Sequence, residues 1–172
     1  MTIYAKLHAY NNPVQYTIAA STTQPDSSWT AYDVPDADWL SLDSNNNIVV
    51  ATADPAIATT KVSQSALMAS SCKSAIEAGF SSSALGTANT YGCKSTDQIN
   101  INLAAIGGGN LWCANSAGVW ALIAHTAAQA QQVQKDMATH IQAQQSTYAK
   151  ALSDIAAATT VAEVEAITWA TP

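Results

Sequence analysis

The side chains that could carry out acid–base or nucleophilic chemistry are few and scattered along this chain. It contains three histidines and three cysteines among 172 residues. A general base needs a positioned acid or nucleophile within hydrogen-bonding reach. Only His125 and Cys113 suggest such a pair, yet nothing near Cys113 in the sequence would lower the pKa of its thiol. We expect His125 to pack or hydrogen-bond at the start of a helix, His8 to lie on a strand and His140 to border a packed helix face. The sequence predicts no catalytic residue.

The three cysteines also lack the pattern of a metal site. Cys72, Cys93 and Cys113 are about 20 residues apart, without the CxxC or mixed His/Cys spacing of zinc ligands. Free cysteine commonly behaves as a small buried hydrophobe. We expect three reduced, structural thiols, and a disulfide between two of them is the alternative. No metal ligand and no cofactor-binding residue is predicted.

Two other segments match known sites only in part. Asp33, Asp36 and Asp38 form the densest carboxylate group, and a metal or glycosidase site would need them to converge. We prefer a simpler interpretation, in which these acids complement the N-terminus of a helical turn. Gly107–Gly109 lacks the following Lys and Ser/Thr of a phosphate-binding loop.

The composition excludes several classes of partner. Charged residues make up 10% of the chain and the net charge is −6, whereas a typical soluble domain is about 25% charged. All six basic residues are lysines without a cluster, so we expect no binding to nucleic acid or to an acidic membrane surface. No apolar run is long enough for membrane insertion. The segment MTIYAKLHAY lacks the features of a signal peptide, so we expect the protein to stay where it is made.

The elements that must position these residues predict an α+β fold in two regions. Residues 1–53 are expected to form a small antiparallel β-rich unit. Apolar and polar residues alternate over 2–10 and 14–20, as in strands with one buried face, and Asn11–Pro13 connects them. Further strands are expected at 29–34 and 48–51, with one helical turn at 34–40 and a turn at Asn45–Asn47.

Residues 54–172 are expected to form a helical domain of two long helices with inserted hairpins. The first helix is predicted at 55–78, because Asp54-Pro55 is a good start and Gly79 a good stop. Its expected buried face consists of Leu67, Met68, Cys72, Ala75 and Ile76. The second is predicted at about 127–158. Its expected buried face consists of Val133, Met137, Ile141, Gln144, Tyr148, Leu152 and Ile155.

Three capping boxes, each predicting the start of a helix, and one hairpin are expected in this second region. The boxes are Thr126 with Gln129, Ser95 with Gln98, and Thr160 with Glu163. The hairpin covers 111–125, with its turn at Asn115–Gly118. We expect its two tryptophans to anchor it on the long helices; they are Trp112 and Trp120. Two short extended runs are expected within 80–91.

Trp29, Trp39 and Trp169 are the candidate partner-binding residues. Tryptophan is enriched at the energetic centres of protein interfaces. The alternative is that these three side chains anchor the core.

The second region contains four ordered motifs: SAIEAGFSSSALGTANTY, STDQININ, LWCANSAGVWALIAHTAAQAQQV and AAATTVAEVEAITW. Together they resemble the motifs of a domain-of-unknown-function family found in tailed-bacteriophage tail proteins, in the neighbourhood of tail-fibre and tail-fibre assembly proteins. The resemblance covers roughly residues 66–169. The segment DADWLSLDSNNNIVVA also looks like the front part of tail-fibre assembly proteins. A short helix is expected from the Ser95–Gln98 box through Ile106. Where the family usually has a longer, often Pro-containing segment after this helix, the chain has Gly107–Gly109.

The resemblance implies a non-enzymatic structural subunit of the virion tail, made in the host cytoplasm. Its implied partners are tail-fibre or baseplate proteins, and the low charge suits a subunit buried among neighbours. A homo-oligomer, with a trimer packed through the Gln-rich face of the second long helix, is expected as well. The alternatives are a tail-fibre assembly chaperone that acts transiently and, from another class, a small hydrolase.

Overall fold

The computed structural model describes residues 1–10, 15–34, 37–51 and 54–170, which contain both helices and strands. The expected α+β class is therefore confirmed. The chain divides into two compact units. The first comprises Met1–Thr60 with Thr159–Val164, and the second comprises Lys61–Ala158 with Glu165–Pro172. Asn11–Pro13, Pro35, Asp36 and the start of the expected strand at 14 lie outside the described residues.

The first unit contains a three-stranded antiparallel sheet of order β2-β1-β3. Pairing sets Leu7 opposite Ile18 and Ile3 opposite Tyr32. The alternation along β1 buries Ile3 and Ala5, as a strand with one covered face requires. Its strands are β1 (Thr2–Tyr10), β2 (Gln15–Ser21) and β3 (Thr30–Asp33).

A small hairpin completes this unit. A single 3₁₀ turn, η1 (Ala37–Trp39), leads into β4 (Leu40–Leu42), which pairs with β5 (Ile48–Val50). β4 was not predicted, because its sequence LSL lacks the run of β-branched residues that indicated β5. The expected turn between the strands is confirmed: Oδ1 of Asp43 accepts hydrogen bonds from the N–H groups of Asn47 and Asn45, both at 2.8 Å. The bonds from Asn47 and Asn45 hold the pKa of Asp43 below its ordinary value.

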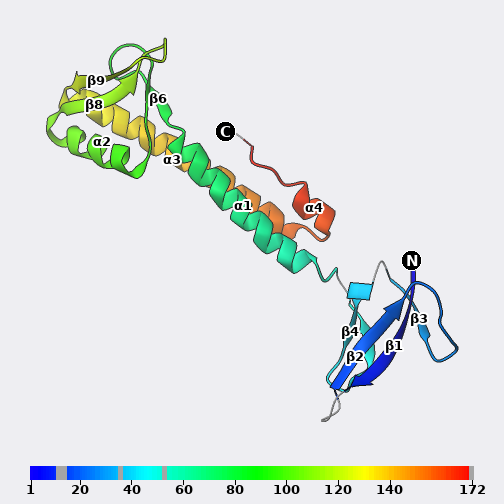
Figure 1. Cartoon of the computed structure of the whole chain (residues 1–172). Coiled ribbons are helices and arrows are strands. Elements are labelled where there is room, and N and C mark those ends of the chain that lie inside the picture. The colour runs from blue at the N-terminus through cyan, green and yellow to red at the C-terminus, as the bar shows by residue number, and fades with distance from the viewer. Residues whose placement is uncertain (11–14, 35–36, 52–53, 171–172) are drawn as a thin grey trace. The chain divides into compact units, whose positions relative to one another are not determined.

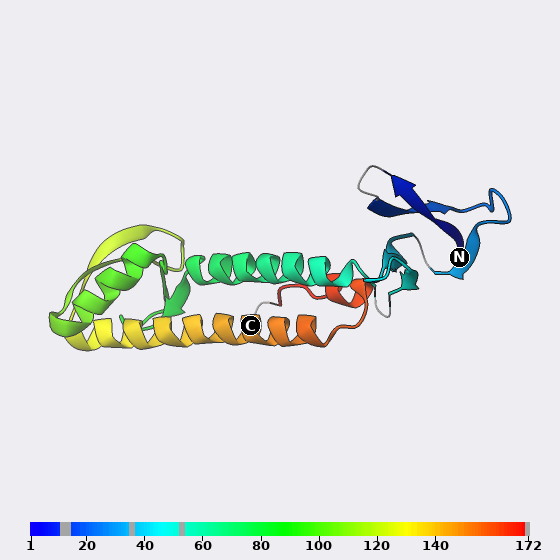
Figure 2. The ribbon, with the colours of Figure 1, turned by 90° about the horizontal axis from the view of Figure 1, so that it is seen from below.

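Two long helices, α1 (Ile57–Glu77) and α3 (Ala127–Ala157), lie side by side in the second unit and run in opposite directions (Figures 1 and 2). Polar contacts fix their alignment. The Lys61 ammonium donates to the carbonyl oxygen of Ala156 at 2.9 Å, and the Cys72 thiol to that of Gln144 at 3.7 Å.

A four-stranded antiparallel sheet and a short helix, α2, cover one end of this pair. Strand order follows the chain, β6-β7-β8-β9. The core between sheet and helices is built from Phe80 and Tyr91, from Ile101 of α2 and from Val133 and Met137 of α3. The elements are β6 (Phe80–Ser82), β7 (Asn89–Tyr91), α2 (Ser95–Gly107), β8 (Gly109–Ala114) and β9 (Trp120–His125), and α4 (Val161–Glu165) follows α3.

Local signals fixed the start of α3 and the end of α1 as predicted, whereas α1 begins at Ile57, two residues after the expected start. At the start of α3, the N–H of Gln129 donates to Oγ1 of Thr126 at 3.3 Å, and the N–H of Thr126 donates to Oε1 of Gln129 at 2.9 Å. α1 ends before Gly79, whose φ of 94° is left-handed. A Cβ at Gly79 would collide with the carbonyl oxygen of Tyr91, so both the backbone and the close approach require glycine.

Two local predictions were wrong. Leu67 is exposed, whereas Met68 and Cys72 are buried, so the packed face of α1 is narrower than expected. The expected box of Ser95 and Gln98 is also displaced by one residue. The Asp97 carboxylate instead accepts the N–H of Lys94 at 3.0 Å, and α2 therefore begins at Ser95.

Thr126→Ala should lower the free energy of unfolding by about 1 kcal/mol, because a backbone N–H of the first turn of α3 loses its side-chain acceptor. Urea unfolding followed by the helical circular-dichroism signal measures this change. Thr139→Ala is the matched control, because Thr139 lies on the exposed part of α3 and its hydroxyl donates to the carbonyl of Lys135 within the same helix at 3.0 Å. Equal losses in the two variants would contradict a specific role for the cap.

Candidate protein-interaction surface

His125 is buried in the second unit, and both of its ring nitrogens have hydrogen-bond partners. Nδ1 of His125 lies 2.8 Å from the carbonyl oxygen of Ile123, which can only accept a hydrogen bond, so Nδ1 carries the proton. Nε2 then accepts the hydroxyl of Tyr91, also at 2.8 Å. Burial is the main cause that raises the pKa of Tyr91, which keeps this hydroxyl a donor. With both ring nitrogens occupied, His125 is placed as a structural residue.

The cysteines are free and buried. Burial raises the pKa of each thiol, for Cys72, Cys93 and Cys113 alike. The pair of Cys113 and His125 therefore offers neither a thiolate nor an available base. No group of three or more His, Cys, Asp or Glu side chains in the described ranges is placed to hold a metal ion.

The outer side of the β8–β9 hairpin carries large apolar side chains in solvent. Trp112 pairs with Leu122 across the two strands, and Ala114 pairs with Trp120. Trp112, Trp120 and Leu122 are 58%, 50% and 52% exposed. We call these three residues the outer hairpin face. The expectation that Trp112 and Trp120 anchor the hairpin on the long helices was wrong, because the pleat turns them away from the core.

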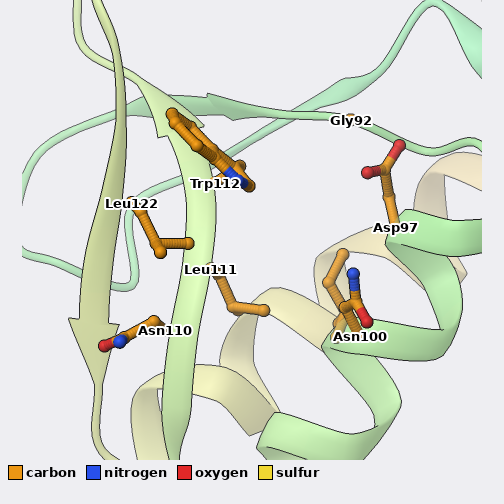
Figure 3. Close-up of a pocket in the computed structure, with 8 residues that line it drawn as sticks. Gly92, Asp97, Asn100, Asn110, Leu111, Trp112 and Leu122 are labelled. Atoms are coloured by element: carbon orange, nitrogen blue, oxygen red, sulfur yellow. The ribbon is translucent and has the colours of Figure 1, made fainter.

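A groove of about 250 Å³ runs between the hairpin and α2 (Figure 3). Leu111 and Ile101 contribute apolar lining. Trp112 lies on the hairpin side, and Asp97 and Asn100 lie on the α2 side, as Figure 3 shows for the labelled residues. Such a mixture suits an apolar side chain that also brings a hydrogen-bond donor.

β9 is an open edge of the sheet. Among the described residues, its sheet partner is β8 alone. The N–H of Asn115 donates to the carbonyl of Val119 at 3.1 Å, so the alternation of antiparallel bonding directs the backbone groups of Trp120, Leu122 and Ala124 away from β8. Natural edge strands usually carry Lys, Pro or a bulge that prevents pairing. The sequence WALIAH of β9 contains neither Lys nor Pro, so this edge is chemically open to another strand.

The three tryptophans predicted to bind partners are all partly buried. Trp39 packs against the core of the first unit, and Trp29 precedes β3. Trp169 lies in the C-terminal segment, beside a cavity of about 530 Å³. Their role in partner binding stays a prediction. The cavity is also lined by Ser71, Ser74, Ala75, Ala78, Gly79, His140 and Gln144.

The sequence pattern missed the outer hairpin face. Its period of two predicted the strands, but a strand with apolar residues on both sides does not show which side is buried. The pairing of Trp112 with Leu122 follows only from the length of the turn. The sequence offered one signal of this face: the chain has more large apolar residues than a small core can bury, so some of them must remain exposed.

The fold and this surface together define a helical unit with a small antiparallel sheet and an exposed apolar hairpin. The chain belongs to the family described as a domain of unknown function, DUF4376, whose sequence model matches residues 59–168. Neither the comparison with curated proteins nor the comparison with solved structures finds a match. Of the helices that the structure describes, none is both long and apolar enough to cross a membrane.

A thiol-specific reagent such as dithionitrobenzoate should not modify the native protein at mildly alkaline pH. The reason is that burial blocks access and raises the pKa of Cys72, Cys93 and Cys113. After denaturation without reductant, all three thiols should react. Release of a single equivalent would instead reveal a disulfide between two of them, and rapid reaction of the folded protein would contradict the buried placement.

Gln144→Met should raise the free energy of unfolding by about 1 kcal/mol. The side chain is buried, and its Oε1 has no hydrogen-bond partner among the described residues, so the change removes a desolvated polar atom at similar volume. Chemical denaturation measures the difference against Gln145→Met, an exposed neighbour that should be neutral. A loss of stability specific to Gln144→Met would show that the amide is paired in the folded protein.

Proposed function

We propose that this chain is a non-enzymatic bacteriophage tail protein that attaches tail components to one another through protein–protein contacts. The observation that carries the proposal is the outer hairpin face. Its two tryptophans and one leucine are each at least half exposed, and contiguous exposed apolar side chains mark interaction sites. Tryptophan is also enriched among the residues that dominate binding energy.

The surroundings of this face support a protein partner rather than a small molecule. The adjoining groove, of about 250 Å³, is small enough to suit single side chains, and the open edge of β9 supplies backbone donors and acceptors. An extended segment of a partner can pair with such an edge while its alternate side chains contact Trp120 and Leu122. These contacts require no catalytic group.

Sequence features supply the tail context. The motif segments from Ser74 to Trp169 resemble phage tail proteins, and the scarcity of charge suits a subunit surrounded by neighbours. The proposed arrangement is a small N-terminal β unit followed by a helical domain of two long helices with inserted hairpins. In this proposal the protein is made in the host cytoplasm and resides in the virion tail, where tail-fibre or baseplate proteins are its partners.

Mass spectrometry of virions purified on a density gradient tests the proposal. The protein should be present in a constant ratio to the other tail proteins. Its absence from virions, together with recovery bound to tail fibres in infected cells, would overturn the structural role and indicate an assembly chaperone. Absence from both would contradict a role in the tail altogether.

A variant of the hairpin tests the surface itself. Trp112→Ala, introduced into the phage, should reduce the amount retained in virions, because loss of a hot-spot tryptophan costs about 2 kcal/mol or more, roughly a 30-fold weaker contact. Val62→Ala on α1 is the control, since Val62 is exposed but lies away from the hairpin in sequence and element. Retention of both variants at the normal level would place the attachment elsewhere on the chain.

A further inference from the structure

α2 is apolar on two opposite sides. One side faces the core and buries Ile101, Ala104 and Ala105. The other side carries three large aliphatic residues that are 58%, 61% and 82% exposed, namely Ile99, Leu103 and Ile106. We call these three residues the α2 stripe.

Helical geometry shows that the stripe is a single surface. At about 100° per residue, Ile99, Leu103 and Ile106 fall within an arc of roughly 60°, on the side of the helix opposite to the buried residues. Asp97 and Asn100 line the hairpin groove, and Gln98 and Asn102 line a hollow shared with α3. The stripe is therefore distinct from the sides of α2 that contact the rest of the unit.

An amphipathic helix normally buries its apolar side against another element. α2 does so only with its inner apolar side, which carries Ile101, Ala104 and Ala105. The outer stripe instead projects three large aliphatic side chains into solvent, in a helix of 13 residues. Such a surface is expected to be covered in the assembled protein.

The charges identify the kind of molecule that covers it. The chain carries a net charge of −6, so identical copies repel each other except where charge is absent. The positions that flank the stripe are Ser95, Asn100, Asn102 and Gly107, all uncharged. When a surface packs against the same surface of an identical copy, any unbalanced charge on it would face a like charge. The α2 stripe and these flanking positions carry no charge. Attraction to a basic or an acidic partner would instead leave complementary charges along the flanks.

The spacing identifies how copies would pack. Thr96, Ile99, Leu103 and Ile106 follow the 3-4-3 spacing of the a and d positions of a heptad repeat. Ile99 and Ile106 then occupy d positions and Leu103 an a position. Leucine at a with isoleucine at d favours bundles of three or four helices over pairs.

We propose that the α2 stripe is the site at which copies of this chain associate with one another, with three or four α2 helices packed around a common axis. Ile99, Leu103 and Ile106 form the contact, and Asn100 and Asn102 border it. The proposal uses side chains other than those of the outer hairpin face, so a heterologous partner on the hairpin and identical copies on α2 do not compete for the same residues. It also moves the expected oligomer contact from the Gln-rich face of α3 to α2.

Light scattering coupled to size-exclusion chromatography of the full chain tests the proposal. The wild-type protein should elute as three or four times its mass of 17.9 kDa. Leu103→Lys should convert it to a monomer, because three or four ammonium groups would meet at the axis. Val62→Lys is the matched control: it places the same charge at an exposed aliphatic residue of α1, and Val62 is 71% exposed. Circular dichroism confirms that both variants retain the wild-type helical signal.

Cross-linking gives a second measurement that does not depend on a disruptive change. Ile106→Cys places a thiol on the stripe, whereas the three native thiols are buried. A short bismaleimide should join Ile106→Cys protomers at high yield in dilute solution, and it should leave Val62→Cys protomers mostly single.

The outcomes separate clearly. Loss of the oligomer with Leu103→Lys alone, together with cross-linking through position 106 alone, supports the proposal. A monomeric wild-type protein, or an oligomer that both lysine variants retain, overturns it. A dimer that Leu103→Lys dissociates overturns the arrangement of three or four helices. None of these results depends on tail attachment, because the purified chain is the sole component.

Discussion

The hydrogen bond between Tyr91 and His125 is the interaction on which the second unit depends. Tyr91 ends β7, stacks on Phe80 of β6, and brings its carbonyl oxygen against Gly79, where α1 has ended. His125 ends β9, and the next residue, Thr126, caps the start of α3. One buried contact therefore connects the end of one long helix, the sheet and the start of the other long helix. Leaving either polar group buried without its partner would cost about 1–3 kcal/mol, so the contact also selects this register over its neighbours.

The small size of that core explains where the other large apolar residues lie. The buried residues that α2 and α3 contribute to it are three alanines and three larger residues, Ile101, Val133 and Met137, so α2 and α3 pack closely and little volume remains. The larger residues of the hairpin and of the outer side of α2 have no place inside and remain in solvent. In a chain whose charged residues are only 10% of the total, these exposed apolar groups are not diluted by charge. They therefore form surfaces that can bind other proteins.

Much of the fold was predictable because its signals are local. The capping box at Thr126 and the stop at Gly79 depend on residues within one helical turn, and both were predicted correctly. The start of α2 was misplaced by one residue because Asp97 and Gln98 can each complete a box, and Asp97 is the one that reaches back. The exposure of Trp112 and Leu67 was not predictable. A periodic pattern shows which residues share one side of a helix or strand, but it does not show which element packs against that side. The interaction surface, unlike the helix ends, depends on tertiary packing.

In the second unit, the interior side chains hold the fold and the exposed apolar side chains offer surfaces for binding. Inside, the polar side chains that could do chemistry are used to hold the fold: His125 is bonded at both nitrogens, and burial raises the pKa of the thiols. Outside, the two apolar surfaces differ in kind. The outer hairpin face combines indole rings with an open strand edge and suits a different protein that supplies a strand. The α2 stripe is aliphatic and uncharged and suits identical copies. If several copies share one axis, their hairpins are presented together, and the second and third contacts with a multivalent partner become effectively intramolecular. A modest affinity at each hairpin is then sufficient for lasting attachment.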